Sequence, residues 1–308
     1  MNKKRCLIAW WGALARGGET IGDLYAVVRV CRLAEQAGYK VSVGTNVMYR
    51  ELREFDCVQW DALAPCEVDL LLFVCGPLIG ESAAFAALMA RYASVPSMAA
   101  GVSVLTAQDG ESWNPFDVTI ARDGIEPCLG DLAGFRPQPP RAPQAMQRIG
   151  LCLRHAQREY GADASLHDAA DALVRAAINM LGGTVVVLDT RLHGQIAKAQ
   201  AIEHAFEAVD LVITTRMHGG LLSLAKGTPT LAIDQIRDGA KVRSVLGGLG
   251  WPVMQAGVAT VADVVDQVRQ LCSDDVPRRI AEFQRQACNR HAAAETAVLD
   301  ALQRMWQR

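Results

Sequence analysis

Short apolar runs alternate with longer amphipathic segments along the whole chain, and this alternation constrains the fold more than any other feature. The first half opens with an apolar run at 6–11, a helical pattern at 21–37 and a second apolar run at 40–43. Strand–helix–strand units of this kind build parallel sheets covered by helices. The alternation restarts in the second half, with apolar runs at 149–153, 184–188, 211–214 and 229–233. The sequence therefore predicts an α/β protein with two doubly wound domains.

A proline-rich stretch separates the two halves. Four prolines fall within residues 135–143, and such a density sustains neither a helix nor a central strand. A chain of 308 residues also exceeds the usual size of one hydrophobic core. Two Rossmann-like domains followed by a long helix resemble the B-type glycosyltransferase architecture, in which the domains face each other across a cleft. The predicted organisation is a Rossmann-like domain at 1–135, a linker at 136–146, a Rossmann-like domain at 147–275 and a C-terminal helix at 276–308.

The composition argues against several classes of protein. Hydrophobic residues make up 51% of the chain, which rules out general disorder. The net charge is −2 and no basic cluster is present, so nucleic acid is not an expected partner. The 9 cysteines are dispersed, as in a reduced cytoplasmic protein, and they form neither a disulfide framework nor a zinc-site pattern.

No transmembrane segment is expected from the sequence. No apolar stretch reaches the length of about 18 residues that a spanning helix needs. The apolar run at 6–11 follows Lys3-Lys4-Arg5 and imitates a secretory leader. Because this run is short, we interpret it as the first core strand.

Segment 211–229 carries the strongest functional signal. The apolar run Leu211–Thr214 ends in Arg216-Met-His218-Gly219-Gly220, and small and aliphatic residues follow. In an open α/β sheet, ligands bind where the carboxyl end of a strand meets the start of a helix, and the helix N-terminus favours an anion. Arg216 offers a planar fork for a phosphate or carboxylate, and His218 can exchange a proton near neutral pH. A helix start with a solvated Arg and His is the alternative.

Two more cations follow predicted strands of the second half. Arg154 directly follows the run at 149–153, and Lys241 comes after the run at 229–233. Because parallel strands end at one edge of a sheet, both can converge with Arg216 on one anionic ligand. Arg154 can equally be a solvated loop residue, since other charged residues follow it. The motif Arg191-Leu-His193-Gly194 imitates the one at Arg216 and is interpreted as a coincidence of loop composition.

In the first half, Glu19 and Asp23 are the best carboxylates for contacting a hydroxylated second substrate. Both lie where a glycine-bearing loop enters a helix for which Thr20 is the predicted cap. Asp23 can instead serve only to stabilise the helix dipole.

Five places between residues 8 and 252 resemble the polysaccharide pyruvyl transferase family. The last of them, Arg216-x-His218-Gly219 with its continuation to Lys241, is specific by itself. Two places depart from the family pattern, since Glu or Thr stands in place of an Asn in the first and Cys75-Gly-Pro-Leu78 replaces a glycine run. The five are Gly18-Glu-Thr-Ile-Gly22-Asp23, Val68–Gly76, Ile120-Ala-Arg122-Asp123, Ile149–Arg154, and Arg216-x-His218-Gly219 with Ala225-x-Gly227-x-Pro229, Ile233-Asp234 and Lys241.

The resemblance implies a transferase that moves the enolpyruvyl-derived group of phosphoenolpyruvate to a hydroxylated acceptor, a saccharide, with no cofactor and no metal. It implies general acid/base catalysis by His218 with Arg216. Donor binding would fall to Arg154, Arg216, Lys241 and Gly219, and acceptor binding to Glu19, Gly22 and Asp23. Two alternatives stay open: a nucleotide-sugar-dependent glycosyltransferase, and a non-catalytic binding protein of the same fold.

Overall fold

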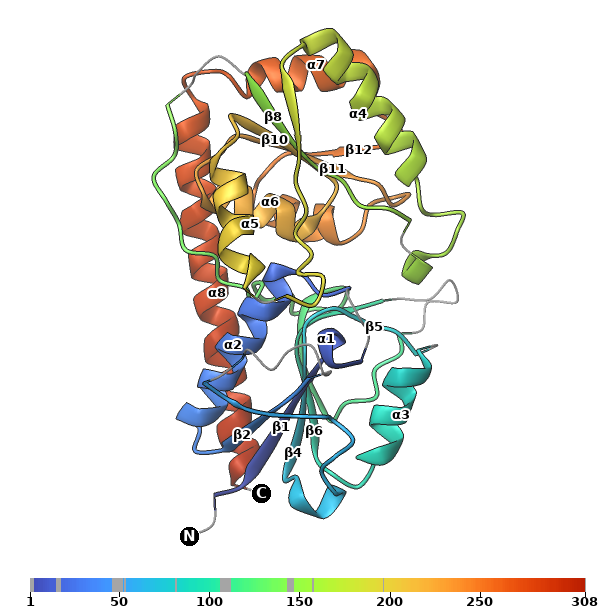
Figure 1. The fold of residues 1–308 in the computed structure, drawn as a ribbon, viewed down its shortest axis with the longest axis vertical. Coiled ribbons are helices and arrows are strands. Elements are labelled where there is room, and N and C mark those ends of the chain that lie inside the picture. Colours follow the sequence, from blue (N-terminus) through green and yellow to red (C-terminus); the bar gives the residue numbers. More distant parts are fainter. Residues whose placement is uncertain are drawn as a thin grey trace. The chain divides into compact units, whose positions relative to one another are not determined.

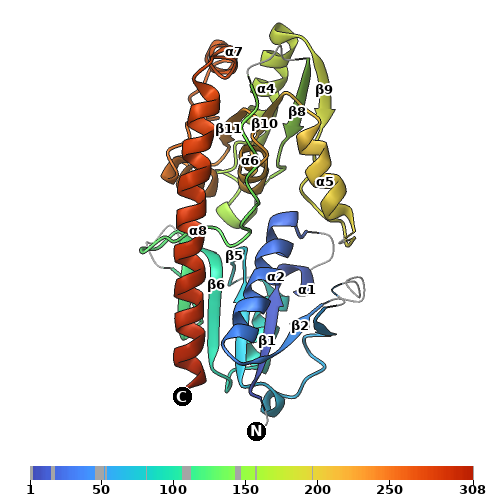
Figure 2. The same ribbon diagram turned by 90° about the vertical axis from the view of Figure 1, so that its left-hand side faces the viewer.

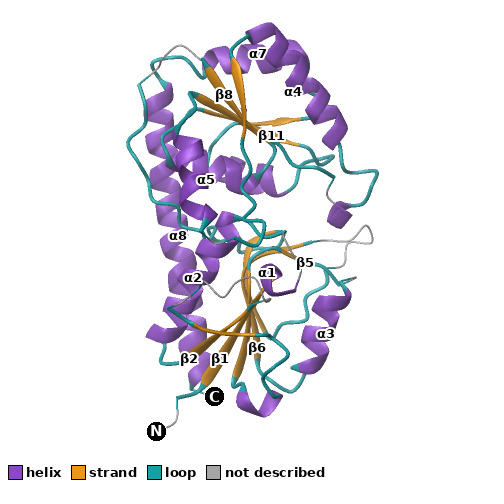
Figure 3. Cartoon of the chain, viewed as in Figure 1, coloured by secondary structure: helices purple, strands orange, loops and turns teal. Residues whose placement is uncertain are grey.

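The computed structural model describes residues 3–14, 18–45, 52, 54–80, 82–105, 112–142, 147–156, 158–195 and 197–307. The chain divides into two compact units. The first comprises Met1–Gly134, Arg191–Ala199 and Asn289–Arg308, and the second comprises Phe135–Thr190 and Gln200–Cys288. Each unit holds one parallel sheet with helices around it (Figures 1 and 3). The predicted α/β fold with two Rossmann-like domains is confirmed.

The first unit contains a 7-stranded sheet with the order β3-β2-β1-β4-β6-β5, in which β7 also pairs with β6. Figure 1 shows α2 and α3 on opposite sides of this sheet. The strands are β1 (Arg5–Trp10), β2 (Lys40–Gly44), β3 (Asp56–Val58), β4 (Leu70–Val74), β5 (Pro77–Leu78), β6 (Ser97–Val104) and β7 (Val118–Asp123). The helices are α1 (Trp11–Leu14), α2 (Ile21–Gln36), η1 (Pro65–Glu67) and α3 (Ala83–Arg91).

The central position of β1 and β4 follows from their composition. Every residue of β4 is buried, and β1 is buried from Cys6 to Trp10, as expected for parallel strands covered on both faces. β1 pairs in parallel with β2 and β4, so that Cys6 lies beside Val41 and Leu70. This order places the carboxyl ends of β1 and β4 next to each other.

The second unit contains a 5-stranded sheet with the order β12-β11-β10-β8-β9. Helix α8 contributes to both units, because the division falls between Cys288 and Asn289; Figure 2 shows it as one long helix. The strands are β8 (Arg148–Cys152), β9 (Thr184–Val187), β10 (Leu211–Thr214), β11 (Thr230–Asp234) and β12 (Val253–Gln255). The helices are η2 (Arg158–Tyr160), α4 (His167–Leu181), α5 (Lys198–Glu207), α6 (Met217–Ala225), η3 (Arg243–Gly247), α7 (Val261–Gln270) and α8 (Val276–Trp306).

The strand order of the second unit reverses between β8 and β10. From β8 the chain goes outward to β9, and it then returns to β10, β11 and β12 on the other side of β8. Right-handed crossovers place helices on both faces of such a sheet, and α4 packs against α7. The carboxyl ends of β8 and β10 therefore form the topological switch point at which open α/β sheets bind ligands.

The first part of the predicted linker belongs to the second unit. Gln138 N donates to Ala225 O at 2.7 Å and Arg141 N donates to Gly227 O at 3.1 Å, so this stretch satisfies carbonyls at the end of α6. Gly227 has φ 71°, and a Cβ on it would lie 2.3 Å from Pro139 O. Close approach of two backbones explains the glycine there. Residues 143–146 of the predicted linker lie outside the described residues.

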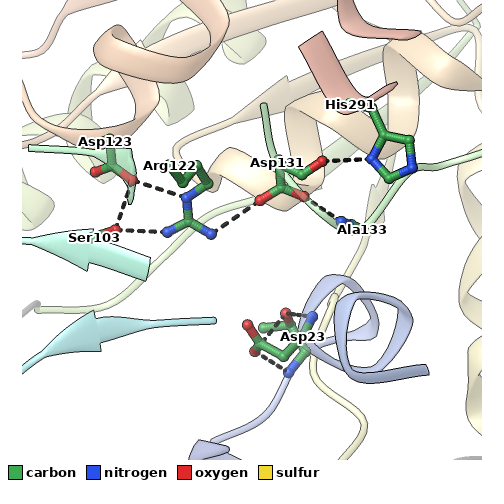
Figure 4. Close-up of polar contacts among 8 residues, drawn as sticks. Asp23, Ser103, Arg122, Asp123, Asp131, Ala133 and His291 are labelled. Carbon is green, nitrogen blue, oxygen red and sulfur yellow. Dashed lines mark hydrogen bonds and ion pairs between the residues drawn. The ribbon is translucent and has the colours of Figure 1, made fainter. Parts of the chain in front are cut away.

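A buried ion-pair network ties β7 to the following loop in the first unit (Figure 4). Arg122 Nε lies 2.9 Å from Asp123 Oδ1, its Nη1 lies 3.0 Å from Asp131 Oδ2, and its Nη2 donates to Ser103 Oγ at 2.6 Å. Burial by itself lowers the pKa of Arg122, but the charges of Asp123 and Asp131 outweigh it and hold the pKa of the guanidinium above its ordinary value. Asp131 also contacts α8, because its backbone carbonyl oxygen lies 2.9 Å from His291 Nδ1. The network thus links the carboxyl end of the sheet to α8.

Replacing Arg122 with Met is expected to destabilise the protein by about 3–5 kcal/mol, because two buried carboxylates lose their cation. The matched control is Arg32→Met, since the Arg32–Glu54 pair is 3.5 Å long and largely exposed and is expected to contribute about 1 kcal/mol or less. Urea unfolding followed by tryptophan fluorescence measures both. Equal destabilisation by the two substitutions would contradict a special role for the Arg122 network.

Candidate functional site

The carboxyl ends of β8 and β10 are joined by hydrogen bonds that involve the predicted site residues. Arg154 N donates to Thr215 Oγ1 at 2.8 Å, and Arg216 Nε donates to Leu153 O at 3.0 Å. One bond therefore runs in each direction across the switch point. The structure places Arg154 and Arg216 on the two strand ends that form the switch point, as the sequence predicts.

Arg216 is the N-cap of α6, and its side chain is only 7% exposed. Its Nη2 lies 3.8 Å from Asp189 Oδ1, which follows β9. Arg216 thereby connects the ends of three strands. Asp189 is not among the residues that the sequence indicates for the site, although it follows the apolar run at 184–188 in the same way that Arg154 and Arg216 follow their own strands.

His218 is the second residue of α6 and is buried. Its ring packs edge-on against Phe135, with the ring centroids 6.3 Å apart. This position at a helix N-terminus agrees with the expectation that the motif joins a strand to a helix. The role of His218 in proton transfer stays a prediction.

The two glycines of the motif are required by packing. A Cβ on Gly219 would lie 2.7 Å from Thr214 Oγ1 and 2.9 Å from Cys152 Sγ, and one on Gly220 would lie 2.4 Å from Leu246 Cδ1. The first turn of α6 therefore touches the strand ends directly. Donor binding by Gly219 stays a prediction, whereas the packing contact already explains the absence of a side chain.

Arg154 and Lys241 converge on one carboxylate. Glu159 Oε1 lies 3.3 Å from Arg154 Nη2 and 3.3 Å from Lys241 Nζ. The side chains of Lys241 and Glu159 are 12% and 10% exposed, and that of Arg154 is 33% exposed. Arg154 Nε is buried, and no acceptor among the described residues lies within hydrogen-bonding distance of it. The structure thus brings Arg154 and Lys241 together on a carboxylate that the sequence did not indicate, and their convergence with Arg216 on an anionic ligand stays a prediction.

Asp234 brings Lys241 back to this edge of the sheet. It ends β11, it is 1% exposed, and its Oδ2 accepts hydrogen bonds from Ala240 N at 2.8 Å and Arg243 N at 2.9 Å. Its Oδ1 accepts a third hydrogen bond, from Ile236 N at 3.0 Å. The loop after β11 is therefore folded back on its own strand end, and Lys241 lies within this loop.

The cysteine nearest to this site is not activated. Cys152 ends β8 and is fully buried, and burial raises the pKa of its thiol to about 11 despite the nearby charge of Arg216. A thiol with such a pKa is neutral at physiological pH and is a poor nucleophile. Cys152 therefore acts as a packing residue against the start of α6.

The predicted acceptor residues lie in the first unit. Glu19 is 1% exposed; its Oε1 accepts a hydrogen bond from Gly194 N at 2.5 Å, and its backbone carbonyl accepts one from Leu192 N at 3.0 Å. Glu19 therefore holds the segment Arg191–Ala199, which contains the second Arg-x-His-Gly motif and belongs to this unit. Its Oε2 is buried and has no hydrogen-bond partner among the described residues.

Asp23 and Gly22 form part of the first turn of α2. Asp23 Oδ2 accepts a hydrogen bond from Thr20 N at 2.8 Å, and Thr20 Oγ1 accepts one from Asp23 N at 3.3 Å, which is a reciprocal capping box. Gly22 is buried within the same turn. The structure thus gives Asp23 the helix-stabilising role that the sequence analysis held as its alternative, and acceptor binding by these residues stays a prediction.

Two further features concern the described part of the chain as a whole. It contains no group of three or more His, Cys, Asp or Glu residues arranged to hold a metal ion. None of the helices described in it is long and apolar enough to cross a membrane.

Comparisons with known proteins give a fold and no family. No protein-family model matches the sequence, and no curated protein matches it. The spinosyn rhamnosyltransferase SpnG matches in structure with a TM-score of 0.54 and 11% identity, over 96% of this chain and 100% of that chain. MnaA of S. aureus in a co-structure with UDP matches with a TM-score of 0.56 and 13% identity, over 96% and 95%. Os79 from O. sativa in complex with UDP matches with 0.51 and 10%, over 98% and 100%. At such identities the similarity shows a glycosyltransferase B-like fold.

These matches contradict the expected transfer of a pyruvyl group from phosphoenolpyruvate. The three structures named above are a rhamnosyltransferase and two proteins captured with UDP, and not pyruvyl transferases. The physical reason for the error lies in the motif at 216–220, where packing of α6 on the strand ends explains both glycines. The motif is thus explained by packing at a strand-to-helix joint and does not identify one chemistry.

Substituting Ala for Gly219 is expected to destabilise the second unit by about 1–3 kcal/mol, because the new methyl group overpacks the contact with Thr214 and Cys152. Gly248→Ala is the matched control: this glycine has helical backbone angles and nothing within 4 Å of its Cβ position. The control is expected to be neutral or to stabilise by up to about 1 kcal/mol. Thermal unfolding of both variants tests the difference, and a neutral Gly219→Ala would refute the packing explanation.

Proposed function

We propose that this chain is a glycosyltransferase that binds a nucleotide-diphosphate sugar through its second unit and transfers the sugar to a hydroxylated acceptor. The observation that carries the proposal is the convergence of Arg154 and Lys241 at the carboxyl edge of the sheet, where the backbone of Arg154 bonds Thr215, two residues before α6 begins. The B-like fold and the UDP present in two of the matching structures support the same choice of donor.

The charge of the donor accounts for the residue types. The first N–H groups of a helix have no intrahelical partner, and they favour an anion together with the helix dipole. Hydrogen bonds to charged groups contribute about 1.5–3 kcal/mol each. Two such bonds with a helix N-terminus therefore support donor binding in the micromolar to millimolar range.

The same groups assist the chemical step. When the bond between the sugar and the diphosphate breaks, the electron pair stays on the diphosphate oxygen and negative charge develops there. Cations that are already in place stabilise this charge without having to reorganise. The acceptor hydroxyl loses its proton as it attacks the sugar carbon, and His218 is the proposed base because it is the titratable residue in the first turn of α6.

UDP or another nucleoside diphosphate is expected to raise the melting temperature of the protein, since a ligand that binds only the folded state stabilises it by about 2.7 kcal/mol at a hundred times its Kd. Arg154→Met and Lys241→Met are each expected to weaken that binding about tenfold or more, by the loss of one charged hydrogen bond. Arg175→Met is the control, because Arg175 is an exposed residue of α4 that pairs with Asp171.

A panel of UDP, GDP, ADP and phosphoenolpyruvate identifies the donor class. Stabilisation by phosphoenolpyruvate alone would refute the proposal.

His218→Gln is expected to lower the rate of sugar transfer by about 10²–10⁴ while the Kd for the nucleoside diphosphate stays nearly unchanged, because the general base acts on the acceptor proton. His155→Gln is the matched control, since the His155 side chain is exposed. Transfer is measured as nucleoside diphosphate released from the donor identified by the binding panel. An unchanged rate in His218→Gln would remove this histidine from the mechanism.

A further inference from the structure

We propose that Glu159 is an internal competitor of the anionic ligand: its carboxylate neutralises Arg154 and Lys241 in the ligand-free chain and is displaced when a ligand with two or more negative charges binds. This inference rests on the proposed function only for the identity of the ligand as a nucleoside diphosphate. The competition itself follows from the contacts of three side chains.

A single oxygen atom of Glu159 occupies the position for which an anionic ligand would compete. Glu159 Oε1 contacts both Arg154 Nη2 and Lys241 Nζ at 3.3 Å. The point that this oxygen occupies is where the fields of the two cations add, and it is the point at which a phosphate oxygen is bound best. A ligand that uses both cations must therefore take the place of the Glu159 carboxylate.

The lengths of these two contacts indicate that each of them is of moderate strength. Strong charge-assisted N–H···O bonds measure about 2.7–2.9 Å, and both contacts of Glu159 are longer than this. The Lys226 ammonium gives a contrast within the same unit, since it lies 2.5 Å from Glu203 and 2.8 Å from Glu207. Glu159 thus neutralises its cations with contacts that a better anion can replace.

The chain around Glu159 permits such a displacement. Glu159 lies in η2, within the loop that joins β8 to α4. The loop is held at its start by Arg154 N on Thr215 Oγ1 and by Gln235 Nε2 on His155 O. At its end, Leu166 N donates to Gln235 O at 2.7 Å, and Arg237 donates to the carbonyls of Asp163 and Ala164. Between these two sets of bonds, Gly161 has φ 80° with open space around its Cβ position, and it is exposed. A displacement of Glu159 therefore need not break the hydrogen bonds at either end of the loop.

The competition makes the site selective by charge. A monoanion that replaces Glu159 merely exchanges one negative charge for another, so its net gain is small. A diphosphate carries more negative charge and more oxygen atoms than a carboxylate. It can therefore make more contacts with the protein than the two that Glu159 loses, including a contact with Arg154 Nε, which has no acceptor among the described residues. Glu159 therefore acts as a specificity-determining residue that disfavours weakly charged ligands.

The test is titration calorimetry with inorganic pyrophosphate, a diphosphate without a nucleoside or a sugar. Glu159→Gln is expected to bind pyrophosphate about tenfold more tightly than the wild type, which is the equivalent of one charged contact that no longer competes. The variant is also expected to bind the monoanion methanesulfonate measurably, whereas the wild type is expected to show no binding of it. Asp163→Asn is the matched control: it removes one charge from the same loop, and within the described residues only the backbone carbonyl of Asp163 accepts hydrogen bonds. Its affinity is expected to stay within about twofold of the wild type, since an exposed charge is screened by solvent.

A second variant guards against a folding defect in Glu159→Gln. Glu159→Asp keeps the charge but shortens the side chain, so it is expected to bind pyrophosphate with an affinity between those of the wild type and Glu159→Gln. Equal or weaker pyrophosphate binding by folded Glu159→Gln overturns the proposal, because Glu159 would then position the cations. So does the absence of pyrophosphate binding in every variant. A gain for pyrophosphate without any binding of nucleoside diphosphates supports the competition and rejects the proposed donor.

Discussion

The hydrogen bonds that join the ends of β8 and β10 determine where the charged groups of the second unit lie. Arg216 Nε and Thr215 Oγ1 bridge to the backbone of Leu153 and Arg154, one contact in each direction. Because the strand order reverses at this joint, the chain leaves β8 toward β9 and leaves β10 toward β11, in opposite directions along the sheet. The glycine at position 219 lets α6 start in contact with the same strand ends. The helix N-terminus, Arg154 and the loop that carries Glu159 are all placed by this one connection.

The two units use arginine in opposite ways. In the first unit the Arg122 side chain is 2% exposed and is surrounded by two carboxylates and a hydroxyl. Such a group is committed to the fold, since removing the guanidinium leaves two buried carboxylates without a cation. In the second unit the Arg154 side chain is 33% exposed and shares one carboxylate with Lys241. Its interaction can be exchanged for another anion because solvent reaches it. Exposure therefore separates the structural arginine from the one suited to binding.

The fold could be predicted because it depends on patterns local to each strand and helix. The alternation of apolar runs indicated both sheets, and the rule that ligands bind beyond strand ends pointed to Arg154, Arg216 and Lys241. Glu159 lies 82 residues from Lys241 in the sequence, so their contact depends on how Asp234 folds the loop after β11 and could not be predicted from spacing. Glu19 is buried and accepts a hydrogen bond from Gly194 N, whereas its expected contact with an acceptor stays a prediction. The contact with Gly194 brings in a segment distant in sequence, which no local pattern predicts.

The error about the donor has a definite physical origin. A helix N-terminus with a pair of cations recognises negative charge and carries little information about the molecule that bears it. Phosphoenolpyruvate and a nucleotide-diphosphate sugar both present phosphate oxygens, so the same Arg154 and Lys241 suit either. The motif around Arg216 adds no discrimination, because the guanidinium is bonded to Leu153 O and lies beside Asp189 within the protein. What distinguishes the two donors is the amount of charge and the number of oxygens that they bring. A residue such as Glu159, which must be displaced before the cations are reached, responds to this difference.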